Sequence, residues 1–214
     1  MTGLDLVAGV FATFFVTIDP IGVVPIFSSL TARMAPARRR RVALTGVGVA
    51  TAVLLLFVLA GDALLAALGI SMPAFRIAGG LLLLWIAAEM LFERRNQRRA
   101  QSAENAADDE NDTVAVFPLA VPLLAGPGAI TAAVLLMSAE AGDPAGQATV
   151  VATLVAVMAL TALMLVAAAR AASFIPAALV DVITRLLGIL LAALAVQFVL
   201  DGVFAAIVAL APEG

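Results

Sequence analysis

The chain contains no cysteine, no histidine and no tyrosine among its 214 residues. The first two absences exclude disulfide bonds, thiol nucleophiles, imidazole bases and the usual zinc or haem ligands. An enzyme would have to work with Asp, Glu, Arg, Ser or Thr, and these residue types show no clustering that suggests an active site. No glycine-rich phosphate-binding loop ending in Lys-Ser or Lys-Thr occurs, so ATP is not the direct energy source within this chain. We therefore expect no enzyme and no metal or cofactor site.

Charged side chains are also scarce, at 13% of the residues, whereas 64% are hydrophobic and the mean hydropathy is +1.14. Soluble domains carry roughly a quarter of their residues as charged ones. Apolar runs separated by short polar stretches recur along the whole length. This pattern predicts one membrane domain, with the lipid bilayer as its surroundings and no nucleic-acid partner.

The first apolar run carries Asp5 and has no basic residue before it. A secretory signal peptide needs a basic start and a small-residue cleavage site, so we expect a retained first helix. About 20 apolar residues cross the hydrocarbon layer of about 30 Å, and six segments meet this test approximately. The sequence therefore predicts an all-α polytopic membrane protein with spans at Leu4–Leu30, Val42–Ala60, Pro73–Phe92, Val114–Ser138, Ala148–Ala169 and Val182–Leu210.

The arginines indicate the orientation, because basic residues in short loops stay on the cytoplasmic side. The loops expected after the first, third and fifth spans carry Arg33, Arg38, Arg39, Arg40, Arg41, Arg94, Arg95, Arg98, Arg99, Arg170 and Arg185. The other side receives Arg76 and mostly acidic residues, with Asp62 in an outer loop. We therefore expect a bacterial inner-membrane protein with both termini outside the cytoplasm.

A polar stretch divides the chain into two halves. Residues 93–113 are rich in arginine at their start and in Asp and Glu toward their end. They are too polar to bury and are typical of a disordered cytoplasmic linker. The expected organisation is a first three-helix repeat over residues 1–92 and a second over residues 114–214.

The two halves share landmarks at a nearly constant spacing. Pro20 matches Pro127, which lies 107 positions later. Gly80 matches Gly188, and Glu89 matches Gln197, each at a spacing of 108 positions. An odd number of spans in each half places the second half upside down in the membrane. We therefore expect a 3+3 inverted repeat of the kind found in transporters. The alternative is chance similarity between helices that are rich in glycine and leucine.

The first and fourth spans carry prolines and glycines near their middle, over Asp19–Pro25 and Pro118–Gly128. Proline removes a backbone donor and clashes with the preceding turn, so these two helices are expected to break. A break exposes the start of a half-helix, whose free N–H groups and positive dipole end attract a carboxylate. Two breaks at matching positions would form a binding site near the bilayer centre. The alternative is a pair of kinked, closely packed helices.

The candidate substrate-binding residues are Asp19, Pro20, Gly22, Gly126, Pro127, Gly128, Thr131 and Gln197. Asp19 is the most informative, because an ionisable group near mid-membrane is costly and usually functional. It could accept hydrogen bonds from a substrate ammonium group, take up a coupling proton, or cap the second half-helix.

The candidate coupling or gate residues are Asp19, Glu89, Arg76 and Arg185. The last three have simpler alternatives. Glu89 could snorkel to the interface, and both arginines could be interface anchors. Gln197 could likewise bond a neighbouring helix.

Several motifs resemble one known family over nearly the whole chain. In the first half they are Ile18-Asp19-Pro20-Ile21-Gly22, Pro25-Ile26-Phe27, Gly69-Ile70-Ser71-Met72-Pro73 and Phe75-Arg76-Ile77-Ala78-Gly79-Gly80. In the second half they are Pro118-Leu119-Ala120-Val121-Pro122, Ala125-Gly126-Pro127-Gly128-Ala129-Ile130, Arg185-Leu186-Leu187-Gly188, Val196-Gln197-Phe198 and Asp201-Gly202. Together they resemble the MarC family of bacterial and archaeal membrane proteins.

The resemblance implies a six-spanning protein, and some members of the family are classed as neutral amino acid transporters. The family more usually has Asn at the positions of Asp19 and Asp201. This departure leaves open whether the protein couples to protons, prefers another substrate, or differs only in helix capping.

The resulting hypothesis is a secondary transporter of small zwitterionic solutes, with a neutral amino acid such as alanine or glycine as substrate and one half rocking against the other. Proton or sodium coupling is left open, and a homo-oligomer is compatible with the sequence. The alternatives are a non-transporting membrane subunit or assembly factor, and a channel. An intramembrane hydrolase is disfavoured, because the chain has no His or Cys and no evident pair of mid-membrane aspartates.

Overall fold

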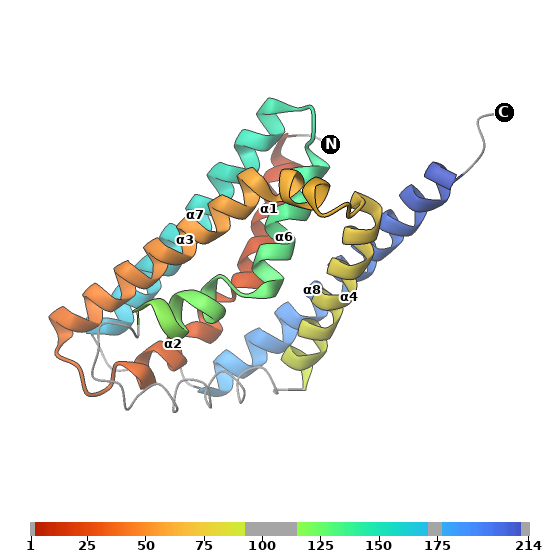
Figure 1. The fold of residues 1–214 in the computed structure, drawn as a ribbon. Helices are drawn as coiled ribbons and strands as arrows, with labels where there is room; N and C mark the ends of the chain where they lie inside the picture. Colours follow the sequence, from red (N-terminus) through yellow and green to blue (C-terminus); the bar gives the residue numbers. More distant parts are fainter. Residues whose placement is uncertain (1–2, 93–114, 171–176, 211–214) are drawn as a thin grey trace.

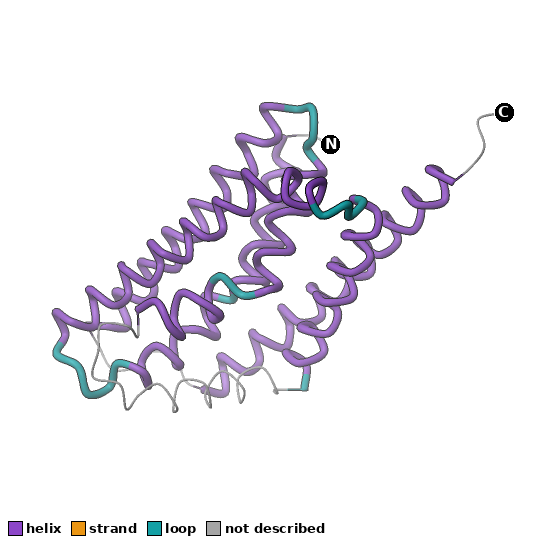
Figure 2. The backbone as a smooth tube through the Cα atoms, in the orientation of Figure 1, coloured by secondary structure: helices purple, strands orange, loops and turns teal. Residues whose placement is uncertain are grey.

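The computed structural model describes residues 3–92, 115–170 and 177–210 (Figure 1). Within these ranges the regular elements are all helices (Figure 2). Five stretches are long and apolar enough to cross a membrane, and a bent pair of helices raises the number to six if it counts as one span. The predicted all-α membrane fold is confirmed at this level. The predicted linker, residues 93–113, lies outside the described part of the chain.

Proline is the first residue of four of the eight described helices. The elements are α1 (Gly3–Ile18), α2 (Pro20–Leu30), α3 (Pro36–Ala67), α4 (Met72–Leu91), η2 (Val116–Leu124), α6 (Pro127–Ala139), α7 (Pro144–Arg170) and α8 (Ala177–Leu210). At the first position of α2, α3, α6 and α7, proline removes no helical hydrogen bond, and its fixed φ suits the helix start. Helix α4 is capped instead by Ser71, whose hydroxyl accepts a hydrogen bond from the N–H of Ala74 at 3.4 Å.

Helix α3 is longer than the sequence predicted, since it covers Pro36–Ala67 rather than Val42–Ala60. The predicted loop positions of Arg38–Arg41 and Asp62 are therefore wrong, because all of them lie within α3. Arg185 likewise lies in the third turn of α8 and not in a loop. Hydropathy marks the hydrocarbon layer of about 30 Å, but arginine is a good helix former and lets a helix continue past it.

The helices surround two buried apolar clusters. Figure 1 shows α3 beside α7 on one side of the molecule and α4 crossing α8 on the other, with α1, α2, η2 and α6 between them. The main cluster draws on α1, α2, α3, η2, α6 and α7. A smaller cluster joins α4 and α8 to Val16 of α1. The α4–α8 pair is connected to the rest of the molecule by α1 and α2, which contact α8, and by α6, which contacts α4.

Glycine lets α4 and α8 approach each other closely. A β-carbon at Gly80 would lie 2.7 Å from the carbonyl oxygen of Ala195, which is closer than real β-carbons come. A β-carbon at Gly188 would lie 3.0 Å from the β-carbon of Met90 and 3.3 Å from the carbonyl oxygen of Ala87, so it would also be tight. The two helices thus touch backbone to backbone, as membrane helices do where small residues line their interface.

We predict that Gly80→Ala lowers the melting temperature of the purified protein, because the added methyl group pushes α8 away from α4. Overpacking of this kind costs about 1–3 kcal/mol. Gly48→Ala is the matched control, since Gly48 is a glycine of α3 whose added β-carbon would meet nothing within 4 Å. Thermal unfolding of the variants in one detergent is the measurement. Equal melting temperatures for the two variants would contradict the close approach.

Candidate functional site at two helix interruptions

Asp19 separates α1 from α2. Its backbone is left-handed, with φ 58° and ψ 61°, a region that aspartate and asparagine tolerate better than other residues with a β-carbon. The side chain is fully buried, and its Oδ1 accepts a hydrogen bond from the backbone N–H of Gly22 at 3.1 Å. Asp19 therefore caps the start of α2 while it redirects the chain.

The neighbours of Asp19 fit this geometry. Pro20, the first residue of α2, has no N–H that needs a partner. A β-carbon at Gly22 would lie 2.8 Å from the carboxyl carbon of Asp19, so glycine lets the carboxylate fold over the helix start. Backbone hydrogen bonds continue on both sides, from Asp19 N to Phe15 O at 2.9 Å and from Val23 N to Asp19 O at 3.1 Å. The interruption is thus confined to one residue.

The second interruption lies between η2 and α6, which are bent by 50° relative to each other. Inside η2, Phe117 and Val121 have extended backbones, with φ −129° and ψ 125° for the first and φ −128° and ψ 123° for the second. Each precedes a proline, which disfavours the helical region. The backbone is also extended at Gly126, and α6 begins at Pro127. A β-carbon at Gly126 would lie 2.6 Å from the carbonyl oxygen of Pro122, so this bend requires glycine.

Helices α2 and α6 both begin at an interruption, and they leave the central region toward opposite ends of the molecule (Figure 1). Helix α1 contacts α6, and α2 contacts η2. Pro20 is buried, whereas Pro127 is exposed, so the start of α6 is the more accessible one. Thr131 of α6 is buried with its methyl group against Gly79 of α4, and a β-carbon at Gly128 would lie 2.6 Å from an α4 side chain. The surroundings of the α6 start are therefore narrow.

The two helix starts differ in how their N–H groups are satisfied. The Asp19 side chain caps α2, but the residue before α6 is Gly126, which has no side chain to cap with. Because the first N–H groups of a helix have no partner within the helix, the start of α6 can receive an acceptor from a ligand. The arrangement thus offers one buried carboxylate and one uncapped helix start.

Gln197 lies away from this region, on the outer face of α8. It is exposed, and its Nε2 donates a hydrogen bond to Oδ1 of Asp201 at 2.8 Å. At 3.6 residues per turn it is rotated about 200° around α8 from Ala195, whose carbonyl faces Gly80 of α4. The structure therefore does not direct Gln197 toward α4 or α1.

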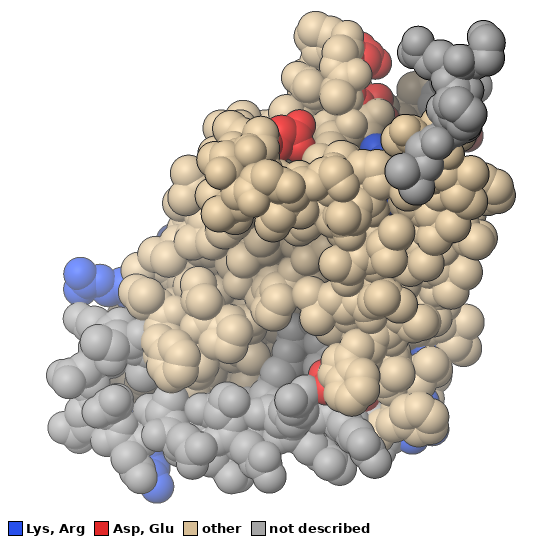
Figure 3. All heavy atoms as spheres, turned by 45° about the vertical axis from the view of Figure 1, so that its right-hand side comes forward, with Lys and Arg blue, Asp and Glu red and all other residues tan. Residues whose placement is uncertain are grey.

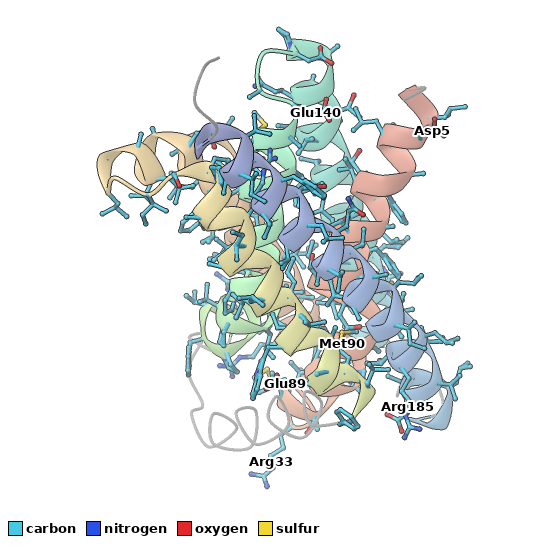
Figure 4. All side chains as sticks on the ribbon, turned by 90° about the vertical axis from the view of Figure 1, so that its right-hand side faces the viewer. Asp5, Arg33, Glu89, Met90, Glu140 and Arg185 are labelled. Carbon is cyan, nitrogen blue, oxygen red and sulfur yellow. The ribbon has the colours of Figure 1, made fainter. Side chains whose placement is uncertain are left out.

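The candidate gate residues on α4 and α8 lie toward the helix ends. Glu89 and Arg185 lie at the end of the molecule that also carries Arg33 (Figure 4). Glu89 accepts a hydrogen bond from Nε1 of the exposed Trp85 at 2.8 Å. Arg76 lies in the second turn of α4, with its β-carbon against α8. These side chains belong to the ends and the outer face of the α4–α8 pair.

Two polar features were missed in the sequence. Thr13 and Thr17 of α1 are buried shortly before Asp19, and the Thr17 hydroxyl donates to the Thr13 carbonyl at 2.8 Å. Their spacing of four residues places them on one helix face, so a signal for this polar stripe was present. Arg39 bonds two other helical segments, but nothing distinguishes it in sequence from the arginines beside it.

We predict that the free energy of unfolding depends on the residue at position 19 and decreases from Asn to Gly to Ala. Asparagine tolerates the left-handed backbone and keeps a capping oxygen, glycine keeps only the backbone conformation, and alanine keeps neither. Asp19→Ala should therefore lose about 1–3 kcal/mol relative to the wild type. Unfolding of Asp19→Asn, Asp19→Gly and Asp19→Ala in detergent is the measurement, and an alanine variant as stable as the asparagine variant would contradict the capping geometry.

Known proteins resemble this chain along nearly its whole length. The model of the MarC family of integral membrane proteins matches residues 4–207. A UPF0056 membrane protein of Methanocaldococcus jannaschii is 39% identical over 195 residues, covering 90% of this chain and 93% of that protein. The UPF0056 membrane protein YhcE of Escherichia coli is 31% identical over 197 residues, covering 90% of this chain and 89% of that protein. No solved structure matches the chain.

The family match includes both interruptions and all the described helices except the outermost residues of α1 and α8. The family indicated by the sequence motifs is thereby confirmed, and relatives occur in both archaea and bacteria. With its helical membrane spans and these matches, the chain belongs to the MarC family of integral membrane proteins.

Proposed function

We propose that this protein is a secondary transporter of small zwitterionic solutes, with neutral amino acids such as alanine and glycine as its substrates. In this proposal the halves form a 3+3 inverted repeat, and the interrupted helices α1–α2 and η2–α6 hold the substrate between them. The observations that carry it are a buried carboxylate at Asp19 and an uncapped helix start at Gly126, two residues that are 107 positions apart and correspond in the proposed repeat.

The pattern of helix contacts supports the inverted repeat. If α1, α2, α3 and α4 are paired with η2, α6, α7 and α8, most contacts have a counterpart. The contact between α3 and α6 has its counterpart between α7 and α2. In the same way, the contact between α4 and α6 matches that between α8 and α2, and the contact between α1 and α7 matches that between η2 and α3. Helices α3 and α4 also contact their own equivalents, α7 and α8. This exchange is expected of two equivalent units related by a twofold axis.

The glycine contacts between α4 and α8 support the same pairing. A β-carbon at Gly80 would meet Ala195 and Val199, and a β-carbon at Gly188 would meet Ala87 and Leu91. The equivalent pairs Gly80 and Gly188, Ala87 and Ala195, and Leu91 and Val199 are each 108 positions apart. Each half thus presents the same contact to the other, as in an isologous interface.

The proposed site matches both ends of an amino acid. The uncapped N–H groups at the start of α6 would bind the carboxylate, where the helix dipole also favours negative charge. The Asp19 carboxylate would accept hydrogen bonds from the ammonium group, and such charge-assisted bonds are the stronger kind. Because Gly128 lies close to the Ile86 side chain of α4, the space beside the start of α6 is narrow on that side, and we expect a substrate with a small side chain.

The energy for this transport would come from a gradient, of protons or of sodium ions. The chain has no nucleotide-binding loop. Its charges also suit one orientation in a bacterial cytoplasmic membrane. Asp5 and Glu140 lie at one end and Arg33 and Arg185 at the other (Figure 4), and in Figure 3 most of the visible acidic side chains lie toward the upper end. With the arginine-rich end in the cytoplasm, both termini would lie outside it.

We predict that this orientation can be measured with single cysteines, since the chain has none of its own. Ala37 of α3 and Ala145 of α7 are both exposed, near the starts of equivalent helices. A membrane-impermeant maleimide added to intact cells should label Ala145→Cys and leave Ala37→Cys unlabelled until the cells are opened. Labelling of Ala37→Cys in intact cells would reverse the proposed topology.

We predict that the purified chain alone, in liposomes, accumulates labelled alanine or glycine when a proton or sodium gradient is imposed. Accumulation against the substrate gradient would exclude both a channel and a subunit that needs a partner. Empty liposomes treated in parallel are the control. Failure to accumulate either amino acid under both gradients would sink the proposed function.

We predict that Asp19→Asn raises the KM for the amino acid about tenfold, because a charge-assisted hydrogen bond becomes a neutral one worth about 1.4 kcal/mol less. The matched control is Asp201→Asn, the same change at an exposed residue of α8, which should leave the KM unchanged. If Asp19→Asn transport also keeps its pH dependence, Asp19 is not the coupling site. Equal KM values for the two variants would remove Asp19 from substrate binding.

A further inference from the structure

We propose that Arg39 is the latch of the arginine-rich end of the protein, and that the opposite end, where the described residues equivalent to the latch form no such set of hydrogen bonds, opens first. The inference rests on the proposed function for what the opening serves. Its basis is a cluster that we call the Arg39 clamp, formed by the guanidinium of Arg39, the hydroxyl of Thr31 and the carbonyl of Ala168. These three residues come from the start of α3, the end of α2 and the end of α7.

The clamp joins three helix ends through one side chain. Arg39 Nε donates to Thr31 Oγ1 at 3.1 Å, and Arg39 Nη2 donates to Ala168 O at 3.1 Å. The Thr31 hydroxyl donates in turn to Phe27 O of α2 at 2.8 Å, so the chain of bonds runs from α7 into α2. Thr31 is fully buried and Ala168 is 4% exposed. The two acceptors of the clamp are thus buried, and the Arg39 side chain that bonds them is half-buried.

The chemistry of the clamp explains why the positive charge is tolerated there. Basic residues are unfavourable at the start of a helix, and Arg38–Arg41 all lie in the first two turns of α3. Arg39 is compensated because Ala168 lies in the last turn of α7, where carbonyls have no partner within the helix and the dipole favours a cation. Parting α2 from α7 would leave a partly buried charge and a carbonyl without their partners, which is costly.

The equivalent position at the other end carries no cationic side chain. At the spacing of 107 positions, Arg39 corresponds to Gly146, Thr31 to Ser138 and Ala168 to Gly61; at the spacing of 108, which relates Pro36 to Pro144, Arg39 corresponds to the uncharged Gln147. Gly146 has no side chain, and the Ser138 hydroxyl donates within its own helix, to Leu135 O at 3.0 Å. Gly61 packs against Val134 of α6.

Asp143, which lies near Gly146, forms a local hydrogen bond. Asp143 Oδ1 accepts a hydrogen bond from the N–H of Ala145 at 3.0 Å, within the start of α7. Gly146, Ser138 and Gly61 therefore form no counterpart of the clamp, which joins three helix ends at the arginine-rich end. If the two ends are packed alike but only one carries the clamp, opening the end without the clamp breaks fewer hydrogen bonds. The protein should therefore populate that opening more often.

The test uses the cysteine-free chain with one reporter cysteine at a time, purified in lipid nanodiscs so that both faces are accessible. Ile26→Cys lies on α2 between the interruption and the clamp, and Ala133→Cys is its equivalent on α6; both positions are buried. Adding Arg39→Ala should raise the rate of maleimide labelling at position 26 about tenfold, which corresponds to about 1.4 kcal/mol. Labelling at position 133 should not rise.

Arg40→Ala is the matched control, since it removes the same charge from an exposed neighbour on α3. It should change neither labelling rate. Unchanged labelling at position 26 in Arg39→Ala would overturn the latch. A rise in the labelling rate at both position 26 and position 133 would also overturn it, because that result would mean that the whole protein had become less stable.

If Arg39→Ala does not fold, Thr31→Val is the variant that tests the clamp. It removes one acceptor of the clamp and keeps the shape of the side chain. It should raise labelling at position 26 several-fold without affecting position 133, and no rise would overturn the proposal. Labelling requires no substrate, so the latch and the transport activity fail separately: absent uptake with selective labelling contradicts only the proposed function.

Discussion

A backbone N–H or C=O that leaves its helix inside a bilayer has no water to bond with, so each helix interruption needs partners from the protein or its ligand. The interruption at Asp19 meets this requirement within the chain, because the carboxylate bonds the N–H of Gly22 and the backbone ladder resumes on both sides. The start of α6 has Gly126 where α2 has a capping carboxylate. Because of this one difference, the two interruptions have opposite chemistry: the first carries a hydrogen-bond acceptor, and the second presents backbone donors.

Features that depend on local chemistry could be predicted from the sequence. The positions of Pro20 and Pro127 at helix starts follow from the missing N–H and fixed φ of proline. The capping role of Asp19 follows from its place before Pro20. The extent of α3 could not be predicted, because hydropathy marks the lipid-facing part of a helix and Arg38–Arg41 are as compatible with a helix as with a loop.

Features that depend on which helix faces meet were beyond the sequence. Helix α8 is apolar nearly all round, so no stripe tells which side packs against α4, and Gln197 proved to be on the exposed side. In the Arg39 clamp, Arg39 bonds Thr31, which is 8 positions away, and Ala168, which is 129 positions away. The run of arginines therefore indicated an orientation, but which member would bond to α7 depends on how the helix ends come together.

Helices α4 and α8 touch backbone to backbone at two separate places, near Gly80 and near Gly188. Along α4 these places are roughly 10 Å apart, measured from Gly80 to Ala87 at about 1.5 Å per residue. Two rigid bodies that share two fixed points keep a single freedom, which is rotation about the line through them. If one helix of the pair belongs to each half, the pair is an axle, and the remaining helices can swing about it but cannot slide along it.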